Sequence, residues 1–116
     1  MNKRQVGSEH EQEAERFLVS SGYKILTKNF YCKAGEIDIV AENEGYLCFI
    51  EVKYRDNTEN GYPEEAVDLR KARKITRSAV FYMTRYGISD VPVRFDVVSI
   101  LGKDIKVIKN AFDAVM

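Results

Sequence analysis

Two short stretches, GEIDIV at residues 35–40 and FIEVK at residues 49–53, determine how this chain of 116 residues is expected to fold. Both alternate apolar and charged residues, which is the period of a β-strand with two different faces. The sequence ENEG at residues 42–45 lies between them and has the composition of a hairpin turn. We therefore predict neighbouring strands over residues 36–42 and 46–54. One face of the first strand is expected to carry Ile37, Ile39 and Ala41.

The charged residues of these strands form a candidate site. Glu51 and Lys53 are two positions apart, so a strand presents both on one face. Asp38 lies on the preceding strand and can come opposite Glu51 in a hairpin of suitable register. Two adjacent carboxylates repel each other, and a hard divalent cation relieves that repulsion; Mg²⁺ is the usual ion where phosphate is also bound. A lysine beside such a metal pair stabilises charge that develops on a phosphoryl oxygen.

A second interpretation requires no chemistry and treats four residues as a solvated strand face with charges of alternating sign: Glu36, Asp38, Glu51 and Lys53. Against it, Phe49 shares the face of Glu51 and Lys53. A central strand covered by a helix would not bury two charges without a use for them. The residues alone leave both interpretations open.

Hydrophobic periodicity predicts the other elements of the chain. It indicates helices over residues 8–21 and from a break near Asp68 to Gly87, and strands over residues 23–29, 93–100 and 105–108. The apolar stripe of the second helix comprises Ala72, Ile75, Ala79, Tyr82, Met83 and Tyr86. The order α-β-β-β-α-β-β predicts an α/β protein with a single domain over residues 1–116.

Composition and cysteine content narrow the class of protein. Hydrophobic residues make up 45% and charged residues 31%, which is the balance of a soluble globular protein. No apolar run is long enough to span a bilayer, so we expect a cytoplasmic protein with no membrane partner. Cys32 and Cys48 form neither a disulfide framework nor a metal knuckle. Cys48 lies in an apolar strand and is expected in the core, whereas Cys32 is expected in a loop.

The net charge is zero, but the charges are separated along the chain. Residues 1–69 carry 8 Lys and Arg against 14 Asp and Glu, whereas residues 70–116 carry 10 against 4. Four cations of the second helix share the face opposite its apolar stripe, with no carboxylate at pairing distance within the helix: Arg70, Arg73, Lys74 and Arg77. This face and Arg55 are candidate contacts for a phosphate backbone, whereas His10 is expected to pack.

Glu11 and Glu36 each have two interpretations. Helical angles place Glu11 at the edge of the apolar face of the first helix, from which it can look toward the sheet. With Ser8 it also forms the pattern of a capping box, S-x-x-E, which alone would explain a glutamate here. Glu36 shares the face of Asp38 and is either a metal ligand through water or an ordinary charged residue at the start of a strand.

Several motifs follow one another along nearly the whole chain. They are G-x-x-x-E at residues 7–11, Asn29-Phe30, GEIDIV, F-I-E-V-K-x-R ending at Arg55, PEEA from Pro63, Lys71, and RFDVV from Arg94. In this order they resemble the YraN-like family of uncharacterised bacterial proteins (uncharacterised protein family 0102), itself similar to archaeal Holliday-junction resolvases. The D…E-x-K spacing also resembles that of the PD-(D/E)XK nucleases.

The resemblance implies a fold and a site. The fold would be restriction-endonuclease-like, with an α-β-β-β-α-β core in which a mixed central sheet is flanked by helices. The site would be that of a divalent-metal phosphodiesterase, with Asp38 and Glu51 as metal ligands and Lys53 as the catalytic lysine. Glu11 corresponds to the helix glutamate that many nucleases of this class add to the metal site.

We therefore expect a Mg²⁺- or Mn²⁺-dependent endonuclease that hydrolyses phosphodiester bonds in DNA, with branched or damaged DNA as the expected substrate. The alternative is a non-catalytic nucleic-acid-binding module on the same fold. Hydrolysis on addition of metal separates the two hypotheses. The choice between DNA and RNA, the sequence or structure recognised, and whether the chain forms a homodimer are left open by the sequence.

Overall fold

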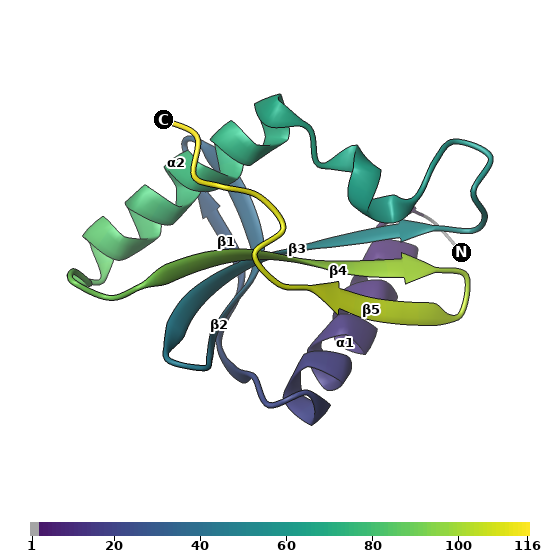
Figure 1. Ribbon diagram of the computed structural model, residues 1–116, viewed down its shortest axis with the longest axis horizontal. Helices are drawn as coiled ribbons and strands as arrows, with labels where there is room; N and C mark the ends of the chain where they lie inside the picture. The colour runs from purple at the N-terminus through teal and green to yellow at the C-terminus, as the bar shows by residue number, and fades with distance from the viewer. Residues whose placement is uncertain (1–2) are drawn as a thin grey trace.

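The computed structural model describes residues 3–116 as one five-stranded sheet with a long helix on each face (Figure 1). The chain starts with a helix and three consecutive strands: α1 (Lys3–Ser20), β1 (Lys24–Cys32), β2 (Gly35–Asn43) and β3 (Tyr46–Arg55). A short 3₁₀-helix, a second α-helix and two strands follow: η1 (Pro63–Ala66), α2 (Leu69–Arg85), β4 (Val93–Leu101) and β5 (Asp104–Ile108). The α/β class and the order of elements are confirmed.

The sheet is mixed, with the strands in the order β1-β2-β3-β4-β5. β3 and β4 are parallel, and the three other neighbouring pairs are antiparallel. A parallel pair needs a long crossover connection, and η1 and α2 supply it between β3 and β4. The antiparallel pairs need only short turns, which Figure 1 shows at the ends of the sheet. The prediction of a mixed central sheet flanked by helices is confirmed.

A capping residue sets the start of α2. Asp68 precedes the helix, and its side chain accepts a hydrogen bond of 2.9 Å from the backbone N–H of Lys71, which confirms the predicted break. Tyr86 lies at the other end and is 55% exposed, so the apolar stripe ends earlier than predicted.

Between Lys3 and Met116, no helix combines the length and apolarity needed to cross a membrane.

Alternation along the strands builds a separate core on each face of the sheet. The core on the α1 side includes Ala14, Leu18, Ile39, Cys48 and Ile50. The core on the α2 side includes Val40, Phe49, Ile75, Ala79 and Tyr82. Because Glu51 and Lys53 follow Phe49 at intervals of two, they lie on the α2 side. The face predicted for these three residues and the core position of Cys48 are confirmed.

Two boundaries differ from those predicted from the sequence. α1 starts at Lys3, five residues before the predicted start at residue 8. β1 continues to Cys32, although the prediction ended it at Asn29. Asn29 has a left-handed φ of 54° that does not end the strand, because pairing with β2 resumes directly after it. Cys32 therefore lies in a strand, and its predicted loop position is wrong.

Candidate active site

The sheet divides between β2 and β3. In the described part of the chain these strands are paired from their turn to the Ile39–Ile50 pair and not beyond it. Past that point β2 stays paired with β1, and β3 stays paired with β4. Residues 35–38 and 51–55 therefore form two edges that are not hydrogen-bonded to each other as strands. We call this feature the β2–β3 split.

Asp38 lies at the start of the split and is only 7% exposed. Its Oδ2 accepts a hydrogen bond of 2.8 Å from the backbone N–H of Val52, so a side chain satisfies the donor that a strand partner would otherwise satisfy. The alternation of β2 changes here: Ile37 packs on the α2 side, whereas Ile39 and Ala41 pack on the α1 side. The prediction that these three residues share one face is wrong, because β2 no longer follows β3 beyond Ile39.

Burial and neighbouring carboxylates act together on Asp38. Burial is the largest cause that raises the pKa of Asp38 to about 7, and the negative charge of Glu51 is the next. Glu11 and Glu36 raise the pKa further, while the hydrogen bond from Val52 acts in the opposite direction. Four carboxyl groups thus act on one another at the split, and we call Glu11, Glu36, Asp38 and Glu51 the acidic cluster.

Glu51 lies on the β3 side of the split and is 5% exposed. Its Oε1 is 3.4 Å from the Nζ of Lys53 and 3.5 Å from the Nζ of Lys71. The structure therefore brings Lys53 to the carboxylate, as predicted, and adds Lys71 from the first turns of α2. Lys71 stood out in the sequence only as part of a family motif. Its position one turn before Ile75 was the available signal, because that spacing puts it on the side of the helix that faces the sheet.

Glu11 reaches the acidic cluster from α1. The side chain of Asn29 donates a hydrogen bond to Glu11 and lowers its pKa, but burial and the charge of Glu36 raise it by more. The capping-box interpretation is wrong, because α1 starts at Lys3 and Ser8 lies inside the helix, where it cannot cap the first turn. Glu11 thus lies within electrostatic range of Glu36 and Glu51, on the side of α1 that faces the sheet.

The carboxylates suit a Mg²⁺ site, in which water and phosphate complete the coordination, better than a site in which protein side chains alone enclose the metal. Among residues 3–116, no three His, Cys, Asp or Glu side chains converge closely enough to enclose a metal. Mg²⁺ usually keeps several water ligands and takes only one or two carboxylates together with substrate phosphate. Asp38 and Glu51 supply that number of buried carboxylates, one from each edge of the split. Glu11 and Glu36 add negative charge nearby.

The predicted basic residues of α2 lie elsewhere. Arg70, Lys74 and Arg77 are exposed, and Arg73 is half-buried. None of the four forms an ion pair with a described carboxylate. They lie on the side of α2 opposite its buried residues, so the α2 basic face (Arg70, Arg73, Lys74 and Arg77) points away from the sheet and from Glu51.

Arg55 and His10 lie nearer to the split. Arg55 ends β3 two positions after Lys53, on the same face, and its buried Nε has no hydrogen-bond partner among the described residues. His10 stacks on Tyr54, with ring centroids 3.7 Å apart, which confirms that the histidine packs. Among the predicted phosphate contacts, Arg55 is therefore the one that lies on the same strand and the same face as Lys53.

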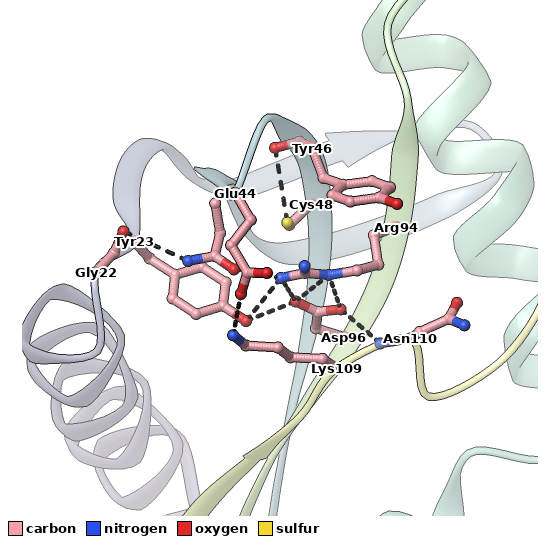
Figure 2. A network of polar contacts seen from close by, with 10 residues as sticks. Gly22, Tyr23, Glu44, Tyr46, Cys48, Arg94, Asp96, Lys109 and Asn110 are labelled. Atoms are coloured by element: carbon pink, nitrogen blue, oxygen red, sulfur yellow. Dashed lines mark hydrogen bonds and ion pairs between the residues drawn. The ribbon is translucent and has the colours of Figure 1, made fainter.

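A second charged cluster lies on the α1 side of the same sheet (Figure 2). Arg94 donates hydrogen bonds to Asp96 (2.9 Å), the Tyr23 hydroxyl (3.1 Å) and Asn43 Oδ1 (2.7 Å). Asp96 also accepts from the Tyr23 hydroxyl at 2.7 Å and from the backbone N–H of Asn110 at 2.9 Å. Hydrogen bonding to Asp96 raises the pKa of Arg94 and keeps it charged. We call these groups the Arg94–Asp96 network.

Sequence reasoning missed this network. Arg94 and Asp96 appeared only inside the RFDVV motif, although two charges spaced by two in an otherwise apolar strand signal a buried pair. Their partners come from positions 23, 43 and 110, which are far apart in the sequence. Only the folded sheet brings them together.

Comparison with known proteins places the chain in a family. Residues 10–100 match the pattern of Uncharacterised protein family UPF0102. The chain belongs to this family. It is 50% identical to a UPF0102 protein of Lachnoclostridium phytofermentans over 115 residues, 98% of each chain. It is 47% identical to one of Persephonella marina over 107 residues, 92% of each chain.

A third relative extends the comparison. The UPF0102 protein FN1370 of Fusobacterium nucleatum is 46% identical over 110 residues, which cover 95% of this chain and 92% of the relative. The resemblance to uncharacterised protein family 0102 drawn from the motifs is thereby confirmed. The acidic cluster, both lysines beside Glu51 and the Arg94–Asp96 pair all lie within the residues matched by the family.

Proposed function

We propose that the protein is a divalent-metal-dependent endonuclease with a restriction-endonuclease-like core, and that it hydrolyses phosphodiester bonds in DNA. The observation that carries the proposal is the pair of buried carboxylates, Asp38 and Glu51, on the two edges of the β2–β3 split, with the Lys53 ammonium 3.4 Å from Glu51. Burial of mutually repelling carboxylates is unfavourable unless a cation uses them. The order α-β-β-β-α-β of the first six main elements supports the same class of fold.

Each residue of the site has a role in this proposal. Asp38 and Glu51 would hold Mg²⁺ or Mn²⁺, which when bound acts as a Lewis acid toward a phosphoryl oxygen and activates water. Lys53 stabilises the negative charge that develops on the phosphate. Glu11 and Glu36 strengthen the negative potential that attracts the ion, and either can contact it through water. Asp38 binds the ion only when deprotonated, so its raised pKa makes the site sensitive to pH near neutrality.

The proposed substrate is DNA, with branched or damaged structures as the expected targets. Arg55 extends the line of positive charge beyond Lys53 on the same face of β3. The α2 basic face supplies four further cations without carboxylate partners among the described residues, and because it points away from Glu51 it can contact only a part of the DNA outside the segment at the carboxylates. Cations in this number suit a phosphate backbone, and such contacts make binding salt-dependent.

A substrate panel tests the proposal. The parent protein and Glu51→Gln would be incubated with duplex, flap, four-way junction and single-stranded DNA and with RNA, each with Mg²⁺, Mn²⁺ or EDTA. We expect metal-dependent cleavage of at least one DNA substrate by the parent and a large loss in Glu51→Gln. Cleavage that persists in EDTA, or that Glu51→Gln retains, would overturn the proposed site.

One observation favours a second candidate, a non-catalytic nucleic-acid-binding module. The α2 basic face lies on the side of the helix opposite Glu51, so nucleic acid bound there does not lie over the carboxylates. A protein of this kind would bind DNA with a steep salt dependence. It would bind no Mn²⁺ and would cleave none of the substrates. Calorimetry with Mn²⁺ alone therefore separates the two candidates before any substrate is found.

A further inference from the structure

The carboxylate of Glu51 is buried between two ammonium groups. Lys53 and Lys71 both approach the same oxygen, Oε1. Glu51 accepts no hydrogen bond from any described residue, so these two ion pairs are its polar contacts in this part of the chain. Glu51 thus has two positive partners, whereas the other carboxylates of the acidic cluster form no ion pair with a described cation.

The two lysines differ in how they are placed. Lys53 lies on the same strand as Glu51, two positions further on, so β3 fixes the position of its backbone relative to that of Glu51. Lys71 comes from α2, whose start is fixed by the hydrogen bond between Asp68 and the backbone N–H of Lys71. The backbone at Lys71 is therefore held in place, while its long side chain is 35% exposed and can swing toward solvent.

The contact of Lys71 with Glu51 is also a loose one. At 3.5 Å the N···O distance exceeds the 2.7–2.9 Å typical of a charge-assisted hydrogen bond, as does the 3.4 Å of Lys53, and Lys71 is the more exposed of the two lysines. The interaction is therefore mainly Coulombic and depends on no particular geometry. A more highly charged cation at the same carboxylate would replace it, because a doubly charged ion attracts Glu51 more strongly and repels the ammonium.

We propose that Lys71 is an exchangeable counter-ion: it neutralises Glu51 in the metal-free protein, leaves the carboxylate when a divalent cation binds, and then contacts a phosphate oxygen of the bound substrate. The inference rests on the proposed metal-dependent function and adds a substrate-contacting residue to it. Lys53 keeps its proposed role of stabilising charge on the reacting phosphate and is not exchanged. The empty protein thereby avoids an unpaired buried carboxylate, and the ammonium becomes free when phosphate needs a partner.

Metal binding in the absence of DNA gives the first test. Lys71→Gln removes the competing charge, so we expect Mn²⁺ to bind about tenfold more tightly than to the parent in calorimetry. Lys71→Arg keeps the charge and should bind Mn²⁺ as the parent does. Lys24→Gln removes an exposed lysine at the opposite end of the sheet and serves as the matched control with unchanged affinity.

Thermal unfolding separates a counter-ion from a packing residue. Lys71→Gln should lower the melting temperature in EDTA, where Glu51 loses a partner, and should lower it little in saturating Mn²⁺. A residue that only packs would lower it equally under both conditions. Should Lys71→Gln fail to fold in EDTA, adding Glu51→Gln should restore folding. Failure of that double variant to fold would assign Lys71 to packing and overturn the inference.

DNA binding tests the second half of the proposal. In a Lys53→Ala background, in which cleavage is too slow to affect the binding measurement, adding Lys71→Gln should weaken duplex binding in Mn²⁺ about tenfold. The salt slope should fall by about 0.9, the value for a single phosphate neutralised by the protein. If the parent binds no Mn²⁺, the proposed function and this inference both fail. If the parent binds Mn²⁺ and Lys71→Gln binds it equally well, only the counter-ion fails. Tighter metal binding with unchanged DNA binding would exclude the phosphate contact.

Discussion

The Arg94–Asp96 pair and the two buried members of the acidic cluster, Asp38 and Glu51, lie in the same sheet, yet their polar groups are satisfied to different degrees. Asp96 is fully buried and accepts hydrogen bonds from Arg94, Tyr23 and the backbone of Asn110. Glu51 is almost as buried but takes part only in loose ion pairs. Asp38 has one backbone donor and three carboxylates around it.

The difference separates charges that hold the fold from charges whose bonding capacity remains open to a ligand. A buried charge with complete hydrogen bonding fixes the arrangement of the elements that donate to it, and it has no capacity left for another partner. Carboxylates that repel one another and lack donors destabilise the empty protein and gain most from a cation. Substitutions in the Arg94–Asp96 network should therefore lower stability. Substitutions in the acidic cluster should lower metal binding and activity while leaving the metal-free protein as stable as the parent or more stable.

Asp96→Ala should have the largest effect. It leaves Arg94 buried without its carboxylate, and loss of one partner of a buried pair lowers the free energy of unfolding by about 3–5 kcal/mol. Urea unfolding followed by circular dichroism measures the change. Lys109→Ala breaks the nearby exposed pair between Lys109 and Glu44 and should change stability little. Equal effects of the two substitutions would contradict the structural role assigned to the network.

Lys53→Ala should have the next largest effect, which is a slower turnover. Removing one group that stabilises transition-state charge reduces the rate by about 10²–10³-fold. Both carboxylates remain and a competing ammonium group beside Glu51 is lost, so Mn²⁺ binding should be at least as tight as in the parent, and the domain should stay folded. Single-turnover cleavage of the best substrate, measured beside Mn²⁺ calorimetry, checks this. A variant that cleaves like the parent would make Lys53 part of a solvated strand face.

Asp38→Asn should weaken Mn²⁺ binding and yet stabilise the metal-free protein. The amide can still accept the Val52 hydrogen bond, while the repulsion from Glu51 is removed. We expect a gain of a few kcal/mol in the free energy of unfolding at pH 8 in EDTA. Partial recovery of cleavage at higher Mn²⁺ concentration should accompany it.

The size of this effect depends on pH. The pKa of Asp38 rises from an ordinary 3.8 to about 7 on folding, so its proton binds more tightly to the folded state. The stabilisation of the parent is complete below about pH 4 and is lost as the pH rises through 7. The difference between variant and parent should therefore vanish near pH 4 and grow toward pH 8. A variant less stable than the parent at every pH would show that Asp38 is a structural residue.

The α2 basic face should give the smallest effect, confined to binding. Replacing Arg70, Arg73, Lys74 and Arg77 by glutamine should leave stability unchanged, because the four side chains have no described carboxylate partners. For every phosphate that the variant no longer neutralises, the magnitude of the log–log salt slope for duplex DNA should fall by about 0.9. Filter binding over a range of salt concentrations measures the slope. An unchanged slope would show that DNA approaches another side of the protein.

The sequence predicted those parts of the site that depend on local periodicity. Glu51 and Lys53 share a face because a strand has a period of two, and Asp38 was placed on the neighbouring strand by the short turn. The end of the β2–β3 pairing could not be predicted, because no local pattern marks where two strands separate. Lys71 and the partners of Arg94 depend on contacts between distant segments, which periodicity does not contain.

The fold shows the same limit. The break before α2 was predictable because Asp68 is a capping residue at a change of periodicity. The extension of β1 past Asn29 was not, because hydrogen bonds to β2 outweigh a local left-handed residue. The start of α1 was misplaced because Ser8 and Glu11 imitate a capping box inside the helix.

The hydrogen bond from Val52 to Asp38 also gives the protein a built-in spectroscopic reporter. The Val52 amide proton lies in a strand but is bound by a carboxylate rather than by a neighbouring strand. Its chemical shift and its rate of exchange with solvent deuterium therefore follow the charge of Asp38 and not the integrity of the sheet. A single backbone resonance thus registers whether the carboxylate is protonated, ionised or occupied by a cation, without any label near the site.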